Sequence, residues 1–224
     1  MLSIRKTQPE RTGVPVNMNL SRWRRSALRL GIALLAAGCV SGCKRFEYVS
    51  TRPLDDAGFS YSVIETLRGL DINKAEVTEL VNAKAGGISE QTCIDLVRVV
   101  HSRKQRFTAG AEAVQLHSAG VGDQALVELM RLDQLGPWTG EAEAIRLAGI
   151  SDRVVLAVAH RRAEGKPALS GASLTKMKNA GLSEPTIYEL AVRGITDGEA
   201  QDLAARRFKG GFSEADVLRS YPGH

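Results

Sequence analysis

Cysteine, aromatic residues and long apolar segments are all scarce in this sequence. It has three cysteines in 224 residues, and aromatic residues make up 5% of it. Cys93 is the single cysteine after Cys43, so the chain beyond that point cannot form an internal disulfide. The apolar run from Leu30 to Val40 has 11 residues, which is well short of the roughly 20 that a membrane-spanning helix needs. A disulfide-stabilised fold after Cys43 is therefore excluded, and the run from Leu30 to Val40 is not expected to span a membrane.

Spacings typical of catalytic or metal-binding residues are also lacking. The four histidines are scattered, with no His-x-x-x-His or Cys-x-x-Cys pattern that would indicate a metal site. Cys93 occupies a position that is apolar in the related segments described below, which indicates a core residue and not a nucleophile. The sequence therefore predicts no enzyme activity, no metal and no cofactor.

The net charge of +5 is misleading as a guide to partners. Seven of the 30 Lys and Arg residues, and one of the 25 acidic residues, lie in residues 1–42. The rest of the chain therefore has 23 basic and 24 acidic side chains. No global field would steer this part of the protein to a polyanion.

The front of the chain has the order basic residues, apolar run, small residues and cysteine. Arg22, Arg24, Arg25 and Arg29 precede the run from Leu30 to Val40, and Val40-Ser41-Gly42-Cys43 ends it. This order resembles the signal peptide of a bacterial lipoprotein, which is cleaved before a cysteine that carries lipid on its sulfur. The resemblance implies that residues 1–42 are a signal peptide and that Cys43 is lipidated. Cys39, after Ala36-Ala37-Gly38, is the second choice.

The resemblance carries two further expectations. Residues 1–17 are mixed in charge and contain two prolines, so we expect translation to start at Met18. Lys44, and not Asp, follows the lipidated cysteine, which in Gram-negative lipoproteins implies a place on the outer membrane facing the periplasm. Several acyl chains would hold the protein stably at a membrane.

A short phrase recurs through the remainder of the chain. It consists of glycine, an apolar residue, serine or glycine, and an acid, with spacings of 33, 29, 32 and 30 residues between the glycines. The five copies begin at Gly87, Gly120, Gly149, Gly181 and Gly211. Glycine can end a helix in the left-handed conformation, serine can cap the next helix, and an acid is favourable at its positive end.

Each copy therefore predicts a helix, a tight corner and a second helix. Apolar residues follow every cap at helical spacing, and no segment alternates as a strand would. We predict an all-α fold of tandem helical hairpins, stacked as a short α-solenoid or closed into a compact helical bundle. Residues 43–58 are interpreted as a lipid-anchored tether and residues 59–224 as the repeat domain.

Residues 70–130 resemble the paired helix-hairpin-helix DNA-binding units of extracellular competence receptors. The resemblance rests on the helical segment from Leu70 to Leu80, the Gly87-Ile88-Ser89 corner and the Gly120-Val121-Gly122 corner. It implies that corner backbone amides contact a phosphate, helped by basic side chains. The implied nucleic-acid contacts are Gly120, Val121, Gly122, Arg98, Arg103, Lys104 and Arg106.

Two functional hypotheses follow. The first is a lipid-anchored protein of the cell envelope that acts as a binding or scaffold module for an unidentified envelope protein or polymer. The alternative is an extracytoplasmic DNA-binding protein that uses residues 70–130. The balance of seven basic and eight acidic side chains in residues 71–131 disfavours the alternative, because binding to phosphates needs a basic surface.

Overall fold

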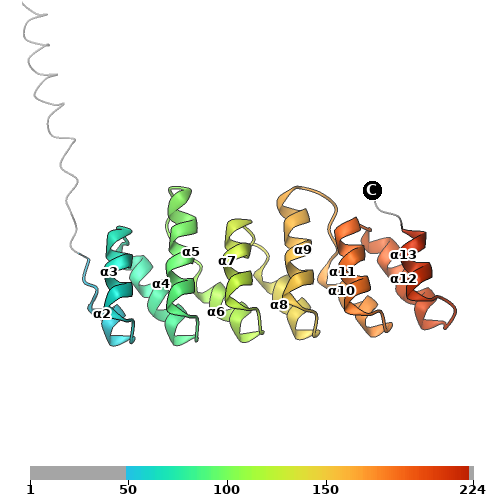
Figure 1. Ribbon diagram of the computed structural model, residues 1–224, viewed down its shortest axis with the longest axis horizontal. Helices are drawn as coiled ribbons and strands as arrows, with labels where there is room; N and C mark the ends of the chain where they lie inside the picture. The colour runs from blue at the N-terminus through green and yellow to red at the C-terminus, as the bar shows by residue number, and fades with distance from the viewer. Residues whose placement is uncertain (1–48, 222–224) are drawn as a thin grey trace, which may run out of the picture. The chain divides into compact units, whose positions relative to one another are not determined.

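The computed structural model describes residues 49–221, and these residues form twelve α-helices and no strand (Figure 1). The all-α prediction is therefore confirmed. Cys39, Cys43 and Met18 lie outside the described residues. Within the described part, no helix has the length and apolar character to cross a membrane.

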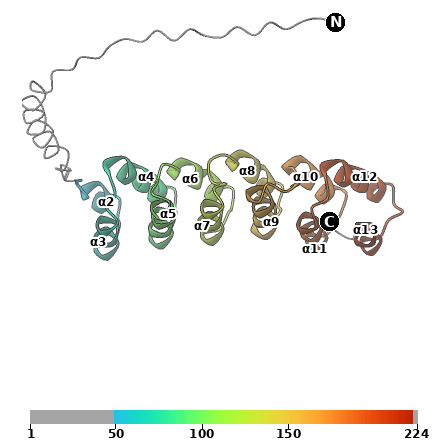
Figure 2. The same ribbon diagram turned by 90° about the horizontal axis from the view of Figure 1, so that it is seen from above.

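The helices alternate between two layers, so that each consecutive pair forms one hairpin (Figure 2). The even layer consists of α2 (Arg52–Asp56), α4 (Lys74–Ala85), α6 (Gly110–Ser118), α8 (Thr139–Leu147), α10 (Gly171–Asn179) and α12 (Asp197–Phe208). The odd layer consists of α3 (Tyr61–Gly69), α5 (Glu90–Ser102), α7 (Asp123–Arg131), α9 (Asp152–Ala163), α11 (Glu184–Arg193) and α13 (Glu214–Ser220).

Packing links neighbours in chain order. Each helix packs against the next helix of its own layer, and α2 to α11 also pack against their hairpin partners. The first and last hairpins lie at opposite ends of the row (Figures 1 and 2). Of the two predicted arrangements, this is the stacked solenoid, in which each hairpin buries its apolar side against its neighbours.

The corners have the predicted construction. Gly87, Gly120, Gly149 and Gly181 have φ between 75° and 91°, which is the left-handed region that glycine adopts readily. The amide of the next residue donates to the carbonyl five positions back, as between Val121 and Leu116 at 2.9 Å. This Schellman-type bond ends the first helix and turns the apolar side chain inward.

Two details of the predicted repeat need correction. A sixth hairpin precedes the five predicted ones, because Gly58-Phe59-Ser60 forms the same corner, with φ of 81° at Gly58. Its first helix, α2, lies within the segment interpreted as a tether, and Leu54 on it is completely buried. In the last corner Gly210, and not Gly211, is left-handed, so this corner is one residue longer.

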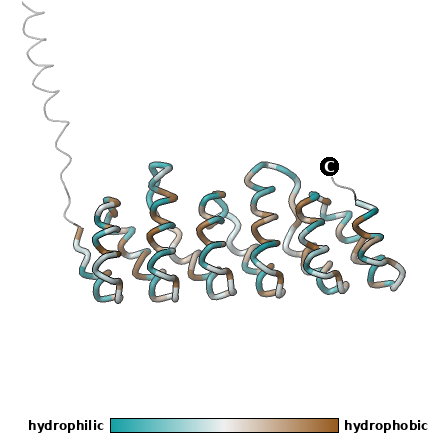
Figure 3. The backbone as a smooth tube through the Cα atoms, viewed as in Figure 1, coloured by the Kyte–Doolittle hydropathy of each residue, from teal (hydrophilic) through white to brown (hydrophobic). Residues whose placement is uncertain are grey.

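The core runs between the two layers. Hydrophobic and hydrophilic residues alternate along each helix (Figure 3), as expected for helices that bury one side. The fourth position of every odd-layer helix from α5 onward is completely buried, as predicted: Cys93, Leu126, Val155, Ile187 and Val217. The fifth position is only partly buried in α9, α11 and α13, where it holds Leu156, Tyr188 and Leu218.

Candidate binding surface

Cys93 has the environment of a core residue. Its side chain is completely buried, and this burial raises the pKa of the thiol to about 12. A thiolate nucleophile requires a lowered pKa and an exposed sulfur. Cys93 therefore contributes packing to the odd layer.

The basic side chains implied as DNA contacts do not surround Gly120. Arg98, Arg103, Lys104 and Arg106 lie in the C-terminal part of α5 and in the loop after it. Gly120 precedes α7, whose N-terminus lies beside the N-terminus of α5. Because α5 has 13 residues, its two ends lie about 20 Å apart.

Arg98, Arg103 and the Gly122 amide are also engaged by groups of the chain itself. Arg98 pairs with Asp95 at 3.4 Å on its own helix. Arg103 contacts Asp133 at 3.3 Å and also donates to a carbonyl at the end of α7. The amide of Gly122, which a phosphate would need, donates to Asp152 Oδ2 at 2.8 Å.

Arg106 belongs to a buried polar cluster that joins α4, α5 and the start of α6. The centre of the cluster is Glu76, whose carboxylate is completely buried. It accepts bonds from His101 Nε2 (2.6 Å), Arg106 Nη1 (3.1 Å), the Phe107 amide (2.9 Å) and the Asn73 amide (2.9 Å). Burial by itself would raise the pKa of Glu76, but these hydrogen bonds outweigh it and hold the pKa below its ordinary value. Each oxygen has two donors, so the cluster is complete without a ligand.

The acid of the repeated phrase bonds the preceding repeat. The sequence pattern predicted that this acid lies at the N-terminus of its own helix. In the odd layer its carboxylate instead bonds the N-terminal turn or the cap of the preceding helix of that layer. In chain order the bonds run from Ser60 Oγ to Glu90 Oε2 (2.7 Å), Thr92 Oγ1 to Asp123 Oδ2 (2.9 Å), Gly122 N to Asp152 Oδ2 (2.8 Å) and Ser183 N to Glu214 Oε1 (2.9 Å). We call these bonds the acid ladder. Each acid engages a helix N-terminus. The bonds of the ladder therefore lie at the corners, where these helices begin.

A basic residue six positions before the acid completes this arrangement. Lys84 pairs with Glu90 at 2.8 Å and Arg146 with Asp152 at 3.1 Å. Sequence reasoning missed these residues, although the spacing recurs at His117 and Asp123, which approach to 3.6 Å. The signal was present as a basic residue six positions before four of the five acids, namely Lys84, His117, Arg146 and Lys178.

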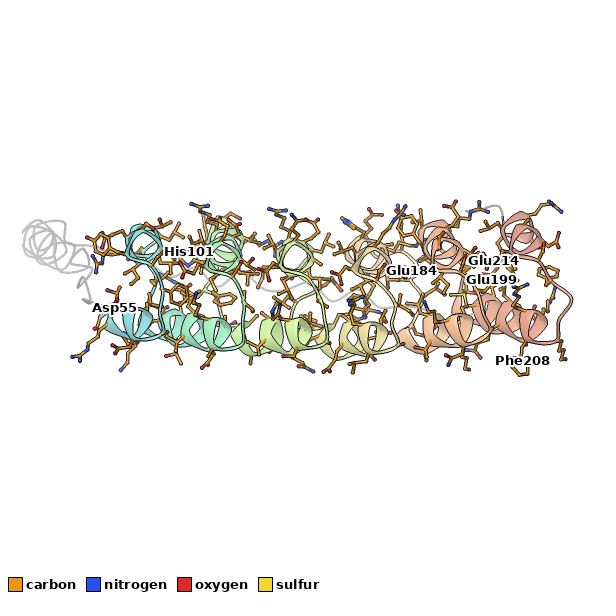
Figure 4. The ribbon with its side chains drawn as sticks, turned by 60° about the horizontal axis from the view of Figure 1, so that its bottom comes forward. Asp55, His101, Glu184, Glu199, Phe208 and Glu214 are labelled. Carbon is orange, nitrogen blue, oxygen red and sulfur yellow. The ribbon has the colours of Figure 1, made fainter. Side chains whose placement is uncertain are left out.

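The ladder is interrupted between α9 and α11. Among the described residues, Glu184 makes no bond to Ser151, the cap of α9, although it begins α11 as the other acids begin their helices (Figure 4). Here Arg153 of α9 stacks on the ring of Tyr188 of α11, with its Cζ 3.8 Å from the ring centroid.

A groove with a volume of about 450 Å³ lies at this same place. Its apolar floor consists of Leu156, Ala157, Tyr188 and Val192, and 44% of Val192 is exposed. Its rim consists of Arg153, His160, Arg161, Glu164 and Lys166. We call this feature the α9/α11 groove.

Arg161 is fixed at one end of the groove by backbone carbonyls. Its Nε donates to Pro167 O at 2.7 Å and its Nη1 to Val192 O at 2.8 Å. Gly194 permits this position of Arg161, because a Cβ at residue 194 would lie 1.8 Å from Arg161 Nη2. Glycine is also favoured at this helix end because its φ is 77°. The two carbonyls are neutral, and among the described residues no carboxylate forms an ion pair with this guanidinium.

Trp138 belongs to the core. Only 2% of it is exposed, and its indole N–H donates to Glu141 Oε2 at 2.6 Å. Arg162 covers the ring at 5.4 Å from its centroid. This residue is therefore not available on the surface.

Comparison with known proteins adds no functional assignment. No protein-family model, no curated protein and no solved structure matches the chain. Across residues 49–221, no group of three or more His, Cys, Asp or Glu side chains is arranged to hold a metal ion. The α9/α11 groove is the feature on which a functional proposal rests.

Proposed function

We propose that the chain is a lipid-anchored helical-repeat protein of the cell envelope, and that it binds a partner through the α9/α11 groove. Lipid on Cys43 would hold it at a membrane, and the stacked hairpins would act as a non-enzymatic binding module. In a Gram-negative cell we place it on the outer membrane, facing the periplasm.

The groove is the observation that supports binding. Elsewhere in the odd layer the acid ladder joins neighbouring helices, and acids such as Glu90 and Asp152 also pair with a cation. Between α9 and α11 an apolar floor remains accessible, with two arginines that form no ion pair among the described residues. An apolar depression with a few placed polar groups is the usual form of a binding site.

Lipid anchoring is tested by metabolic labelling with palmitate in a Gram-negative host. We expect label in the wild type and in C39A, and loss of label in C43A, because only Cys43 follows the favoured cleavage sequence. Label that persists in the C39A/C43A double variant would contradict anchoring at either cysteine.

Binding is tested by a photo-crosslinking amino acid in place of Val192 in cells. A matched probe in place of Ala144, which is exposed on the even layer, serves as the control. We expect a discrete protein adduct from position 192 and none from position 144. Equal adducts at both positions, or none at 192, would refute binding through the groove.

A further inference from the structure

The charge of the α9/α11 groove is positive and incompletely neutralised. Lys166 pairs with Glu164 at 2.7 Å, but among the described residues neither Arg153 nor Arg161 forms an ion pair with a carboxylate. Arg153 stacks on Tyr188, an arrangement that leaves the in-plane N–H groups of a guanidinium free to donate. Arg161 uses two of its five N–H groups on carbonyls. Both arginines can therefore accept a carboxylate partner.

A second groove, with a volume of about 490 Å³, lies between α5 and α7, and Gln91, Asp95 and Arg131 are among its lining residues. Comparison with it shows that the charge of the α9/α11 groove is particular to that groove. Counted from the helix starts, Arg153 takes the place of Gln91, and Ala157 takes the place of Asp95. On the facing helix, Val192 takes the place of Arg131. An acid and a base are thus both replaced by apolar residues, and Arg153 is an added cation. Arg161 is a second added cation, since it takes the place of Val99.

The floor requires an apolar group in any ligand. Leu156 and Tyr188 occupy the position that is held by the buried Ile94 and Val127 in α5 and α7, yet they are only partly covered. A polymer of phosphates would satisfy the arginines and leave this apolar surface in water. A protein segment with both acidic and apolar side chains would cover the whole groove.

The spacing of the two arginines sets the length of that segment. Arg153 and Arg161 are eight residues apart on α9, which corresponds to about 12 Å along the helix axis. An extended peptide covers this distance in about four residues, at roughly 3.3 Å each. Its first, third and fifth side chains point to the same side. Two acids at the ends and one apolar residue between them would all face the groove.

We infer that the α9/α11 groove binds an extended protein segment of the pattern acid, any residue, large apolar residue, any residue, acid. This inference rests on the proposed function and specifies its partner. The acids would contact Arg153 and Arg161, and the apolar side chain would lie on Leu156, Tyr188 and Val192.

The test uses the purified full-length protein in nanodiscs and fluorescein-labelled five-residue peptides. The probe has glutamate at both ends and tryptophan at its centre, separated by glycines. One control peptide has glutamine at both ends, and another has glycine at its centre. We expect either change to weaken binding in fluorescence anisotropy by about tenfold or more, because each removes half of the recognition.

Variants of the protein locate the site. A157D gives α9 the acid that α5 has at this position, so it should fold, and it places a carboxylate where the ligand's acids approach. We expect it to weaken binding of the probe by about tenfold, and R153Q to weaken it by about fivefold. R98Q removes a cation from α5 on the same layer and should leave binding unchanged. Thermal unfolding followed by circular dichroism verifies that each variant is folded.

Three outcomes would overturn the inference. These are no binding of the probe up to about 1 mM, equal binding of the glutamine peptide, and displacement of the probe by inorganic polyphosphate at equal charge. The last would indicate a site for phosphate polymers. If the in-cell adduct at position 192 forms while the probe fails to bind, the proposed function stands and only this inference fails.

Discussion

Replacement of Glu76 by glutamine tests whether the buried cluster between α4, α5 and α6 holds the second and third hairpins together. The carboxylate is completely buried and each of its oxygens accepts two hydrogen bonds. One oxygen faces the amide of Phe107 and the other faces the amide of Asn73. The amide nitrogen of glutamine would therefore face a backbone donor in either orientation.

The expected loss of stability is large for a change of one atom. Removal of one partner from a buried, hydrogen-bonded charge cluster typically costs about 3–5 kcal/mol. Domains of this size are stable by about 5–15 kcal/mol in total. E76Q should therefore remove a substantial part of the free energy of unfolding.

The matched control is E199Q. Glu199 is also the third residue of its helix and forms a capping box with Thr196, but it is only partly buried. Because glutamine also serves in a capping box, E199Q should lose less than about 1 kcal/mol. Urea unfolding at pH 7 measures both free energies. A loss in E76Q no larger than that in E199Q would refute the reasoning.

The same cluster gives a pH dependence with a definite sign. Although burial opposes it, hydrogen bonding to Phe107, Asn73 and His101 lowers the pKa of Glu76 in the folded state. The stabilisation is therefore fully present above the unfolded pKa of about 4.3 and is lost as the pH falls through the folded pKa. The difference between wild type and E76Q should shrink below about pH 4. A difference that grows on acidification would contradict this account.

The remaining predictions concern the ladder, two glycines and the thiol. E214A should lower the free energy of unfolding by about 1–3 kcal/mol, measured by urea unfolding, because Glu214 accepts a bond from Ser183 at the start of α11. E184A should be nearly neutral, because Glu184 makes no such bond among the described residues. G110A should destabilise the protein by about 1–3 kcal/mol, because its Cβ would lie 2.6 Å from a backbone carbonyl of α4. G140A should be stabilising in thermal unfolding, because the space around residue 140 is open. Cys93 should react with a thiol reagent only in urea, and rapid labelling of the native protein would contradict its burial.

The corners were predictable because their physics is local. A left-handed glycine, a buried apolar residue and a serine cap act within four consecutive residues, as at Gly149-Ile150-Ser151. The same local signal was present at Gly58, but its first helix has only five residues. Such a short helix forms through packing and not through its own propensity, so the sixth hairpin escaped sequence reasoning.

The candidate site depended on contacts between distant residues. The acid ladder joins residues about 30 positions apart, and the sequence showed only that the acids recur. The resemblance to helix-hairpin-helix units grouped Arg98 with Gly120, yet Arg98 lies in the C-terminal part of α5 and Gly120 lies at the corner before α7. The groove combines α9 and α11, which come from different hairpins.

The amino-acid sequence alone determined that the chain forms helices, where most of them end and which side of each is buried, since capping and helical periodicity are properties of neighbouring residues. Only the tertiary structure decided which polar groups are satisfied and which remain accessible. A carboxylate such as Glu76 is buried or exposed according to what the next hairpin places over it, and Arg153 and Arg161 stay available because the facing helix offers them a ring and carbonyls in place of an acid.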